Sequence, residues 1–172
     1  NGVKDAHPYL EAIPSGLHDP EKPTWGGWGG RFGGSGPQYF STAQDMVGGE
    51  TSGRATVWRW RPGFMNDFAA RMDWCVWPFS QANHAPIAVI NGSTSPSVTA
   101  GEVVTLSAAG SSDPDGNSLS YKWWWYPEPG SYSGTLTINN STSATASFAA
   151  PAVSSTKTIH VIVPLLAGAG TD

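Results

Sequence analysis

The sequence predicts a mainly β protein: a β-sandwich over residues 85–172, preceded over 1–84 by a Gly- and Trp-rich, largely irregular segment with one short helix. In the second segment, runs of Val, Ile, Thr and aromatic residues alternate with turn signals at intervals of roughly 8–12 residues, as in such sandwiches. The 172 residues include 21 Gly and 14 Pro, and only 13% are charged. This composition disfavours a helical protein, because glycine and proline destabilise helix interiors.

Six runs of the second segment are predicted to be strands, because they are rich in residues that favour extended structure. Turn signals separate them, among them the sequence Asp-Pro-Asp-Gly at 113–116. Residues 164–172 show no strand pattern, which leaves two alternatives. Either this segment replaces the last strand, or the sandwich lacks its last strand and exposes an edge. The six predicted strands are 87–90, 103–106, 119–126, 134–138, 144–148 and 156–163.

The first segment is predicted to be irregular because residues 23–53 are rich in glycine, which weakens both helices and central strands. One helix is predicted at about 62–76, since Pro62 suits a first helical turn. A short strand is predicted at 58–61, where Trp and Arg alternate. The helix has apolar residues at helical spacing, and we expect Cys75 on that side to be buried. These residues are Phe64, Phe68, Met72 and Cys75.

Charge and hydropathy exclude two classes of partner. The net charge is −4 and the nine Lys and Arg residues form no run, so binding to a nucleic acid through its phosphates is not expected. No apolar stretch approaches the roughly 20 residues of a membrane span, so no membrane partner is expected. Low charge with many Gly, Ser, Thr and Asn residues indicates an exported bacterial protein, either secreted and extracellular or periplasmic. No signal peptide is visible in the sequence, which opens on Asn1 rather than Met, so we expect a mature or excised piece.

The second segment carries a recognisable set of motifs. Asp-Pro-Asp-Gly-Asn at 113–117 is followed by Leu-Ser-Tyr at 119–121 and by Trp123. Over about 83–163 the chain resembles the PKD-like and related immunoglobulin-like modules of bacterial extracellular enzymes. The resemblance implies an immunoglobulin-like β-sandwich with Trp123 in its interior.

The first segment adds further motifs, namely Trp-Gly-Gly-Trp-Gly-Gly-Arg at 25–31, the Trp- and Arg-rich run 56–61 and the run 66–74. With Asn-His-Ala-Pro at 83–86, these motifs are similar to the C-terminal part of the bacterial nucleoside-hydrolase-like family described as cellulose-binding proteins. The resemblance implies that 1–84 is the tail of a hydrolase-like domain and that 85–172 is an immunoglobulin- or PKD-like domain. It also implies an N-terminal hydrolase-like domain in the full-length protein. That family's aspartate-rich metal loop is missing here.

Aromatic residues are the candidate binding residues, because aromatic rings stack on the flat faces of sugars. Residues 121–126 alternate along a strand, so Trp124 and Tyr126 face away from Trp123, which the resemblance puts in the interior. Trp25 and Trp28 lie in the glycine-rich loop. The resemblance implies a polysaccharide ligand, cellulose or another plant-wall β-glucan. The alternative is that these residues only pack. Trp124 and Tyr126 would then pack against the first segment, and Trp25 and Trp28 would anchor the glycine-rich loop to the hydrolase-like domain.

Acidic residues suggest two places for Ca²⁺. By resemblance, Asp67 corresponds to a late aspartate ligand of nucleoside hydrolases, although it equally suits a helix cap or an ion pair with Arg71 four residues on. Asp113, Asp115 and Asn117 supply oxygens at alternate positions, as calcium loops do, although a tight turn explains the same pattern. Calcium takes six to eight oxygen ligands. One carboxylate cannot supply that shell, so we expect no catalysis by this chain alone.

Three interpretations follow. The first is an extracellular carbohydrate-binding module without catalysis of its own. The second is the C-terminal piece of a nucleoside-hydrolase-like glycosidase, to which Asp67 contributes one metal-site carboxylate. The third is a structural spacer. Trp124 and Tyr126 discriminate between binding and a spacer, because exposed, coplanar rings favour binding, whereas rings buried under the first segment favour a spacer.

Overall fold

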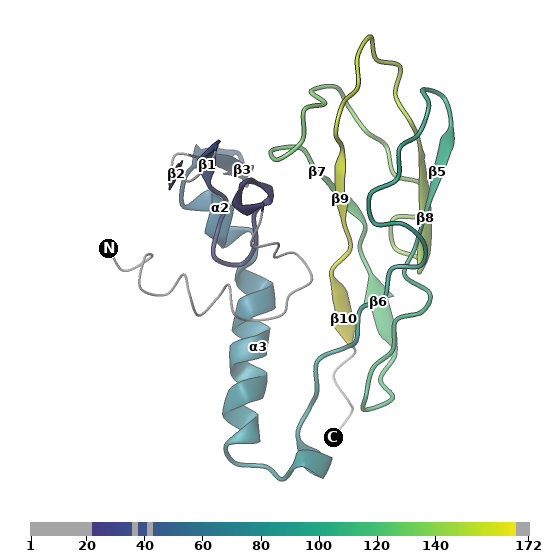
Figure 1. The fold of residues 1–172 in the computed structure, drawn as a ribbon. Helices are drawn as coiled ribbons and strands as arrows, with labels where there is room; N and C mark the ends of the chain where they lie inside the picture. The colour runs from purple at the N-terminus through teal and green to yellow at the C-terminus, as the bar shows by residue number, and fades with distance from the viewer. Residues whose placement is uncertain (1–21, 36–37, 41–42, 168–172) are drawn as a thin grey trace. The chain divides into compact units, whose positions relative to one another are not determined.

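A computed structural model describes residues 22–35, 38–40 and 43–167. The chain divides into two compact units, Asn1–Pro78 and Phe79–Asp172 (Figure 1), a few residues before the change of composition near residue 84. The described residues are mainly β, as predicted, with small two-stranded antiparallel sheets and one long helix. None of the described helices has the length and apolar character needed to cross a bilayer.

The first unit contains short elements, as its glycine content predicts. Its two hairpins, β1–β2 and β3–β4, have strands of three residues. Gly48 and Gly49 form the turn of the second hairpin with φ of 61° and 85°, values that glycine adopts without strain. The elements are η1 Pro23–Trp25, β1 Gly33–Ser35, β2 Gln38–Phe40, β3 Asp45–Val47, β4 Glu50–Ser52, α2 Ala55–Trp58 and α3 Arg61–Trp74.

Helix α3 confirms the helix predicted at 62–76, with Pro62 in its first turn. The strand predicted at 58–61 is wrong, because the chain is helical on both sides of this stretch. The hydroxyl of Ser52 accepts a hydrogen bond from the backbone N–H of Ala55 at 3.1 Å. The Thr56 hydroxyl donates to the Gly53 carbonyl at 2.8 Å. These local bonds stabilise the helical turn α2, where alternation of Trp and Arg alone suggests a strand.

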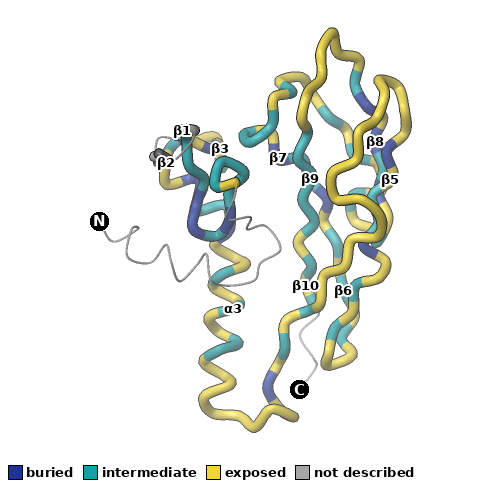
Figure 2. The backbone as a smooth tube through the Cα atoms, viewed as in Figure 1, coloured by how far each residue is buried: buried dark blue, intermediate teal, exposed yellow. Residues whose placement is uncertain are grey.

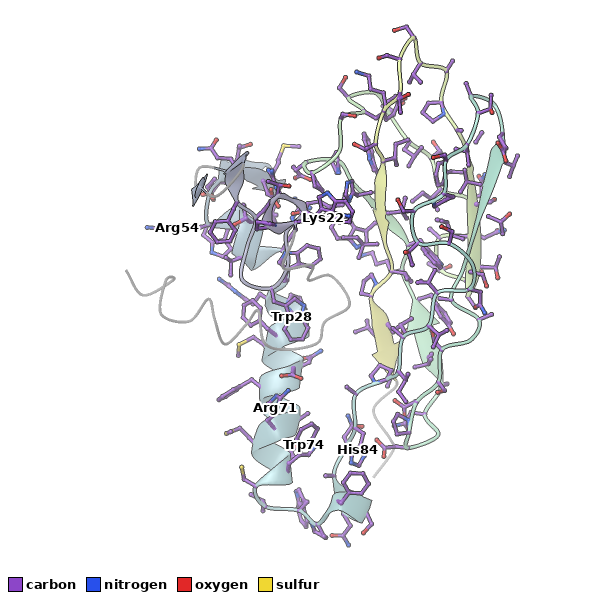
Figure 3. The ribbon with its side chains drawn as sticks, viewed as in Figure 1. Lys22, Trp28, Arg54, Arg71, Trp74 and His84 are labelled. Carbon is purple, nitrogen blue, oxygen red and sulfur yellow. The ribbon has the colours of Figure 1, made fainter. Side chains whose placement is uncertain are left out.

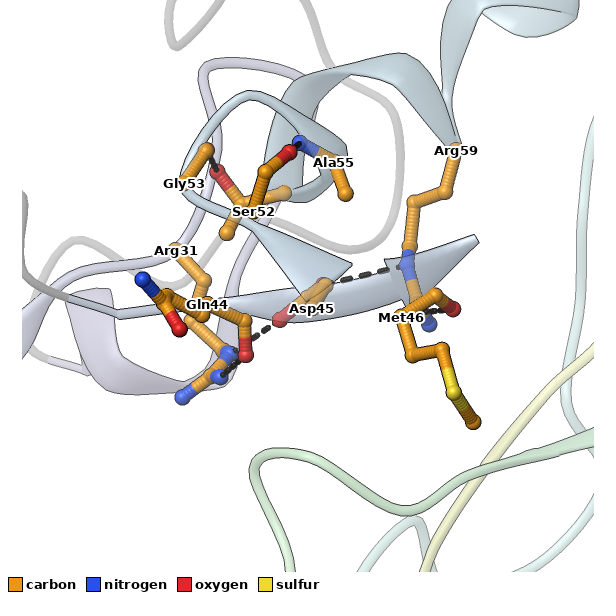
Figure 4. A network of polar contacts seen from close by, with 9 residues as sticks. Arg31, Gln44, Asp45, Met46, Ser52, Gly53, Ala55 and Arg59 are labelled. Carbon is orange, nitrogen blue, oxygen red and sulfur yellow. Dashed lines mark hydrogen bonds and ion pairs between the residues drawn. The ribbon is translucent and has the colours of Figure 1, made fainter. Parts of the chain in front are cut away.

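A buried carboxylate joins three parts of the first unit (Figure 4). Asp45, at the start of β3, is fully buried and accepts from Arg31 Nε at 2.8 Å. Its other oxygen lies 3.0 Å from Arg59 Nε, just after α2. Each guanidinium also donates to a carbonyl of the β3 region, Arg31 to Gln44 and Arg59 to Met46. The network therefore ties the glycine-rich loop and the helical part to one hairpin.

The second unit forms two layers of strands (Figure 1). Strands β5 and β8 form one antiparallel pair, and the other layer contains the pairs β7–β9 and β6–β10. The predicted strands at 103–106 and 144–148 are confirmed. The runs 87–90 and 134–138 form no strand, although single bridges join Ile87 to Ser112 and Asn139 to Ser147. The elements are η2 Phe79–Gln81, β5 Val103–Ser107, β6 Leu119–Tyr121, β7 Trp124–Tyr126, β8 Thr145–Ala149, β9 His160–Ile162 and β10 Leu165–Ala167.

The pairs β7–β9 and β6–β10 share one continuous register. Trp124 pairs with Ile162, and Tyr121 pairs with Leu165. Continuing either register places Lys122 opposite Pro164, which has no N–H to donate to the ladder. The long strand predicted at 119–126 is therefore divided into β6 and β7 at this proline.

Strand β10 continues the ladder of β9 past Pro164. Leu165–Ala167 pair with Leu119–Tyr121 in the register that β9 keeps with β7, so this part of residues 164–172 extends the strand at 160–162 and adds no further strand. The absence of a further last strand stays a prediction. Pro164 masks the pattern, because it interrupts the ladder without ending it. Residues 168–172 lie outside the described residues.

Apolar side chains between the two layers form the core of the second unit. Val104 and Phe148, which pair across β5 and β8, are buried and pack with Ile159 and Val161 from the other layer. A second cluster surrounds Trp123. The unit therefore buries its apolar residues between its own strands.

Cys75 is exposed, so the prediction of a buried cysteine is wrong. The reason is that α3 has no buried residue along its length, as Figure 2 shows by its exposed and intermediate colours. The apolar spacing predicts the helix correctly, but it does not guarantee that the described residues cover its apolar side.

We expect Asp45→Ala to destabilise the first unit by about 3–5 kcal/mol, because it leaves Arg31 and Arg59 buried without their carboxylate. Asp67→Ala is the matched control: its i,i+4 ion pair with Arg71 is part-exposed and is worth about 0.3–0.5 kcal/mol. Urea denaturation of both variants measures the difference. Equal losses of unfolding free energy in the two variants would contradict a dominant role for Asp45.

Candidate functional site

The aromatic run of β6 and β7 has its inner face where the sequence predicts it. Trp123 is 5% exposed, and it packs with Ala108, Ala146 and the partly buried Tyr121. Its indole N–H donates to the Ser143 carbonyl at 2.8 Å. The interior position of Trp123 is confirmed, and Trp124 and Tyr126 therefore lie on the opposite face of the strand.

That opposite face is not an open platform. Trp124 is half-buried, and Tyr126 is only 1% exposed, so the expectation that Tyr126 is exposed is wrong. The Trp124 ring lies against it on the same side of β7, and His160 is its backbone partner across the ladder. The two rings are 5.6 Å apart between centroids and inclined by 46°, so they are not coplanar. Of these two residues, Trp124 is the one that keeps exposed surface.

Trp25 and Trp28 each have a packing partner within the first unit. The Lys22 ammonium lies 3.9 Å from the centroid of the Trp25 ring, a cation–π contact. The Trp28 ring lies so close to Gly63 of α3 that a side-chain carbon there would be 3.3 Å away. Trp28 therefore anchors the glycine-rich loop to α3, beside which Figure 3 labels it. The pair does not form an isolated clamp.

Asp67 is paired with a neighbouring cation. Its carboxylate accepts from Arg71 Nε at 2.7 Å, one helical turn along α3. Helix α3 begins at Arg61, so Asp67 does not open the helix as a cap would. The structural alternative, an i,i+4 ion pair, is the one the structure contains.

The acidic loop at 113–117 is a hydrogen-bonded turn. Asp113 Oδ1 accepts from the backbone N–H groups of Asp115 at 2.9 Å and Asn117 at 3.2 Å. Gly116 supplies the positive φ of 77° that the turn requires. Within residues 22–35, 38–40 and 43–167, no three His, Cys, Asp or Glu side chains gather as a metal site would need. Calcium binding at this loop stays a prediction.

Asp115 connects the start of the second unit to that turn through contacts with His84. Its Oδ2 accepts from the His84 backbone N–H at 2.6 Å, and its Oδ1 lies 2.7 Å from His84 Nδ1. The His84 ring also packs on Phe79, with 4.1 Å between centroids. The hydrogen bond from the His84 backbone, followed by that from its ring, holds the pKa of the Asp115 carboxyl below its ordinary value.

Two exposed tryptophans are residues that the sequence motifs did not mark as candidate binding residues. Trp74, at the end of α3, is 41% exposed, and Trp77 is 54% exposed. The Arg71 guanidinium lies 5.4 Å from the Trp74 ring (Figure 3). The signal was present in the run Trp-Cys-Val-Trp at 74–77, where two Trp residues follow the helix pattern directly.

A pocket of about 390 Å³ lies at one end of the second unit. Its lining contains Lys157 but no aromatic ring and no carboxylate, and none of the predicted site residues is part of it. Its lining residues are Val98, Thr99, Ala100, Ala150, Pro151, Val153, Ser154, Ser155, Thr156, Lys157 and Ile159.

Residues 103–167 match the profile of the family described as cellulose-binding protein Sde0182, C-terminal domain. This part of the chain is similar to that family's domain. The resemblance stated from the sequence motifs is confirmed over these residues, and the match covers β5 to β10. Trp124, Tyr126 and the 113–117 turn lie within the matched residues, whereas Trp25, Trp28 and Asp67 lie outside them.

A solved structure extends the similarity to the first unit. It is a nucleoside hydrolase-related hypothetical protein from Saccharophagus degradans that is associated with carbohydrate metabolism. The two chains are 36% identical with a TM-score of 0.72, over 94% of this chain. This chain spans 43% of the length of the Saccharophagus protein. Comparison with curated proteins gives no match.

Asp115→Asn should lower the thermal unfolding midpoint at pH 7, because it removes a carboxylate that is stabilised in the folded state. A depressed folded pKa contributes stability above the unfolded pKa of about 3.9, and this contribution is lost as the pH falls through the folded pKa. The difference in unfolding midpoint between wild type and variant should therefore be largest at pH 5–7 and should shrink below about pH 4. Thermal scans across this range measure it.

Asp73→Asn, which alters an exposed acid on α3, is the matched control and should change the midpoint little at any pH. A difference between wild type and Asp115→Asn that stays constant down to pH 2 would contradict the assignment.

Proposed function

We propose that this chain binds a carbohydrate through its second unit and has no catalytic activity of its own. The observation that carries the proposal is the match of residues 103–167 to a domain family named for cellulose binding. The Saccharophagus protein, associated with carbohydrate metabolism, supports the same ligand class. The ligand that this reasoning favours is cellulose or a related plant-wall β-glucan, which would place the protein outside the bacterial cell.

Trp124 is the residue proposed to stack on the sugar. It lies within the family domain on the face of β7 opposite the Trp123 core, and part of its ring is exposed. The Tyr126 ring, inclined against it at 5.6 Å, would fix its orientation and so reduce the entropy lost on binding. One indole is a small platform, so we expect weak binding that gains strength when several copies meet an extended polymer.

Charge is compatible with a neutral ligand. The chain has only nine Lys and Arg and thirteen Asp and Glu residues among 172. The described acids examined above are engaged, Asp45 and Asp67 with arginines and Asp115 with His84. This engagement supports a role in binding over a role in hydrolysis.

A second candidate function rests on the length of the solved relative. Because this chain spans 43% of that protein, the chain is also suited to be part of a larger nucleoside-hydrolase-related protein whose chemistry lies in the remaining residues. In that case the second unit would bring the larger protein to its polysaccharide.

The test is a pull-down of the full chain on insoluble cellulose and on xylan. Wild type should be retained on cellulose, and Trp124→Ala should bind more weakly by about 1–3 kcal/mol, if stacking on sugar matches stacking on bases. That loss is at least about fivefold in affinity.

Trp77→Ala is the matched control, since it removes an indole that is more exposed than Trp124 but lies outside the family domain. It should bind as wild type does. Failure of wild type to bind either polymer would overturn the proposal, and equal losses in both variants would overturn the assignment to Trp124.

A further inference from the structure

The pocket of about 390 Å³ in the second unit has walls that hydrogen bonds hold in place. One wall is the turn before β5, and the other is the connection from β8 to β9. Two backbone hydrogen bonds join these walls. The Gly101 N–H donates to the Ala150 carbonyl at 2.8 Å, and the Ala150 N–H donates to the Glu102 carbonyl at 2.8 Å. The turn therefore keeps its position against the end of β8.

The connection from β8 to β9 is also fixed at its far end. The Thr158 N–H donates to the Ser131 hydroxyl at 2.9 Å, and the Ser131 N–H donates to the Thr158 carbonyl at 3.1 Å. Two residues of the lining, Ala150 and Ile159, are part of an apolar core cluster. Because the pocket is held in this way before a ligand arrives, binding orders few additional groups and loses little entropy.

The polar side chains of the lining are four hydroxyls and one ammonium. They belong to Thr99, Ser154, Ser155, Thr156 and Lys157. Among the described residues, the side chains from 154 to 157 have no hydrogen-bond or ion-pair partner. Three adjacent hydroxyls and a neighbouring ammonium are therefore available to a ligand in the pocket.

The charge of Lys157 favours an anionic ligand. Among the described residues that line the pocket, Lys157 is the one that carries a charge. The nearest acid along the chain from the turn, Glu102, is engaged, because its Oε2 accepts from the Thr99 backbone N–H at 3.0 Å. A single ammonium suits one carboxylate, whereas proteins bind phosphate groups with clusters of cations. The charge of the lining therefore indicates a ligand that carries one carboxylate.

The remaining lining suits the ring of a sugar. Its hydroxyls match ring hydroxyls as hydrogen-bond partners, and its apolar side chains offer surface to the C–H groups of the ring. The volume of about 390 Å³ lies at the lower end of the range for small-ligand pockets, which is about 300–1,000 Å³. The apolar residues of the lining are Val98, Ala100, Ala150, Pro151, Val153 and Ile159.

We propose that this pocket binds a sugar acid, that is, a hexose ring that bears one carboxylate. The Lys157 ammonium would hold the carboxylate, and the hydroxyls of residues 154–156 would hold the ring hydroxyls. Trp124 is not part of the lining, so the proposal does not rest on stacking of a neutral glucan there. The chain would then recognise an acidic sugar as well as a neutral polysaccharide.

The test is a titration of the full chain at pH 7, followed through its backbone amide signals by NMR. The probe is sodium glucuronate, and glucose and sodium acetate are the comparison ligands, because each supplies one part of its chemistry. Glucuronate should shift the amide signals of residues 154–157 saturably. It should bind about fivefold more tightly than glucose, the upper end for one exposed ion pair, and acetate should bind more weakly than glucuronate. Added salt should reduce the preference over glucose.

Lys157→Gln should weaken the binding of glucuronate about fivefold, to the affinity for glucose. Lys122→Gln is the matched control, since Lys122 is the other Lys or Arg within residues 85–172 and does not line the pocket. It should bind glucuronate as wild type does. Both lysines are exposed, so neither variant should disturb the fold, and the dispersion of the amide signals verifies this.

Three results would overturn the proposal. The first is the absence of a saturable shift at residues 154–157. The second is binding of glucose, acetate or inorganic phosphate as tightly as glucuronate, because the pocket would then not select a sugar acid. The third is an equal loss of affinity in the two lysine variants. None of these results depends on retention on cellulose, so this proposal and the proposed function are tested separately.

Discussion

The first unit depends on one buried carboxylate. Asp45 is fully buried between Arg31 and Arg59, and these three residues come from a glycine-rich loop, a hairpin and the end of a short helix. None of these segments has enough apolar residues to form a core, so a charged network holds them in place. Such a network imposes geometry, because leaving any one charge unpaired in the interior is costly. It fixes where the chain enters α3 and therefore the orientation of the helix within the unit.

The second unit has an apolar core instead of a charged network. This core lies between two layers of strands, and a polar contact joins Asp115 to His84 at the start of the unit. Pro164 interrupts one ladder without ending it, and at this gap the backbone N–H of Trp123 donates to Ser141 at 2.7 Å. The backbone of Trp123, whose side chain packs in the core, is therefore at the point where the ladder is interrupted. The interruption at Pro164 and the position of Trp123 are parts of the same local structure.

The sequence predicts the elements better than it predicts their exposure. Residue preference and spacing identify β5, β8 and α3, because these depend on local composition. The same reasoning misses β10, since a proline hides its pairing, and α2, since hydroxyl hydrogen bonds override the alternation of Trp and Arg. The resemblance places Trp123 correctly in the interior, and alternation puts Trp124 and Tyr126 on the other face, but neither indicates that Tyr126 is buried. Exposure depends on neighbours distant in sequence, and for that reason the candidate platform reduces to Trp124.

The exposed tryptophans lie in two parts of the chain. Trp124 lies within residues 103–167, which match the Sde0182 profile, on a strand whose inner face holds the core. Trp74 and Trp77 lie outside those residues, at the end of α3 and just after it. A ring that recognises a flat ligand needs a fixed orientation, because a mobile ring loses more entropy on binding. A position on a strand whose other face is packed meets that need, and for that reason the proposal assigns stacking to Trp124 and not to Trp77.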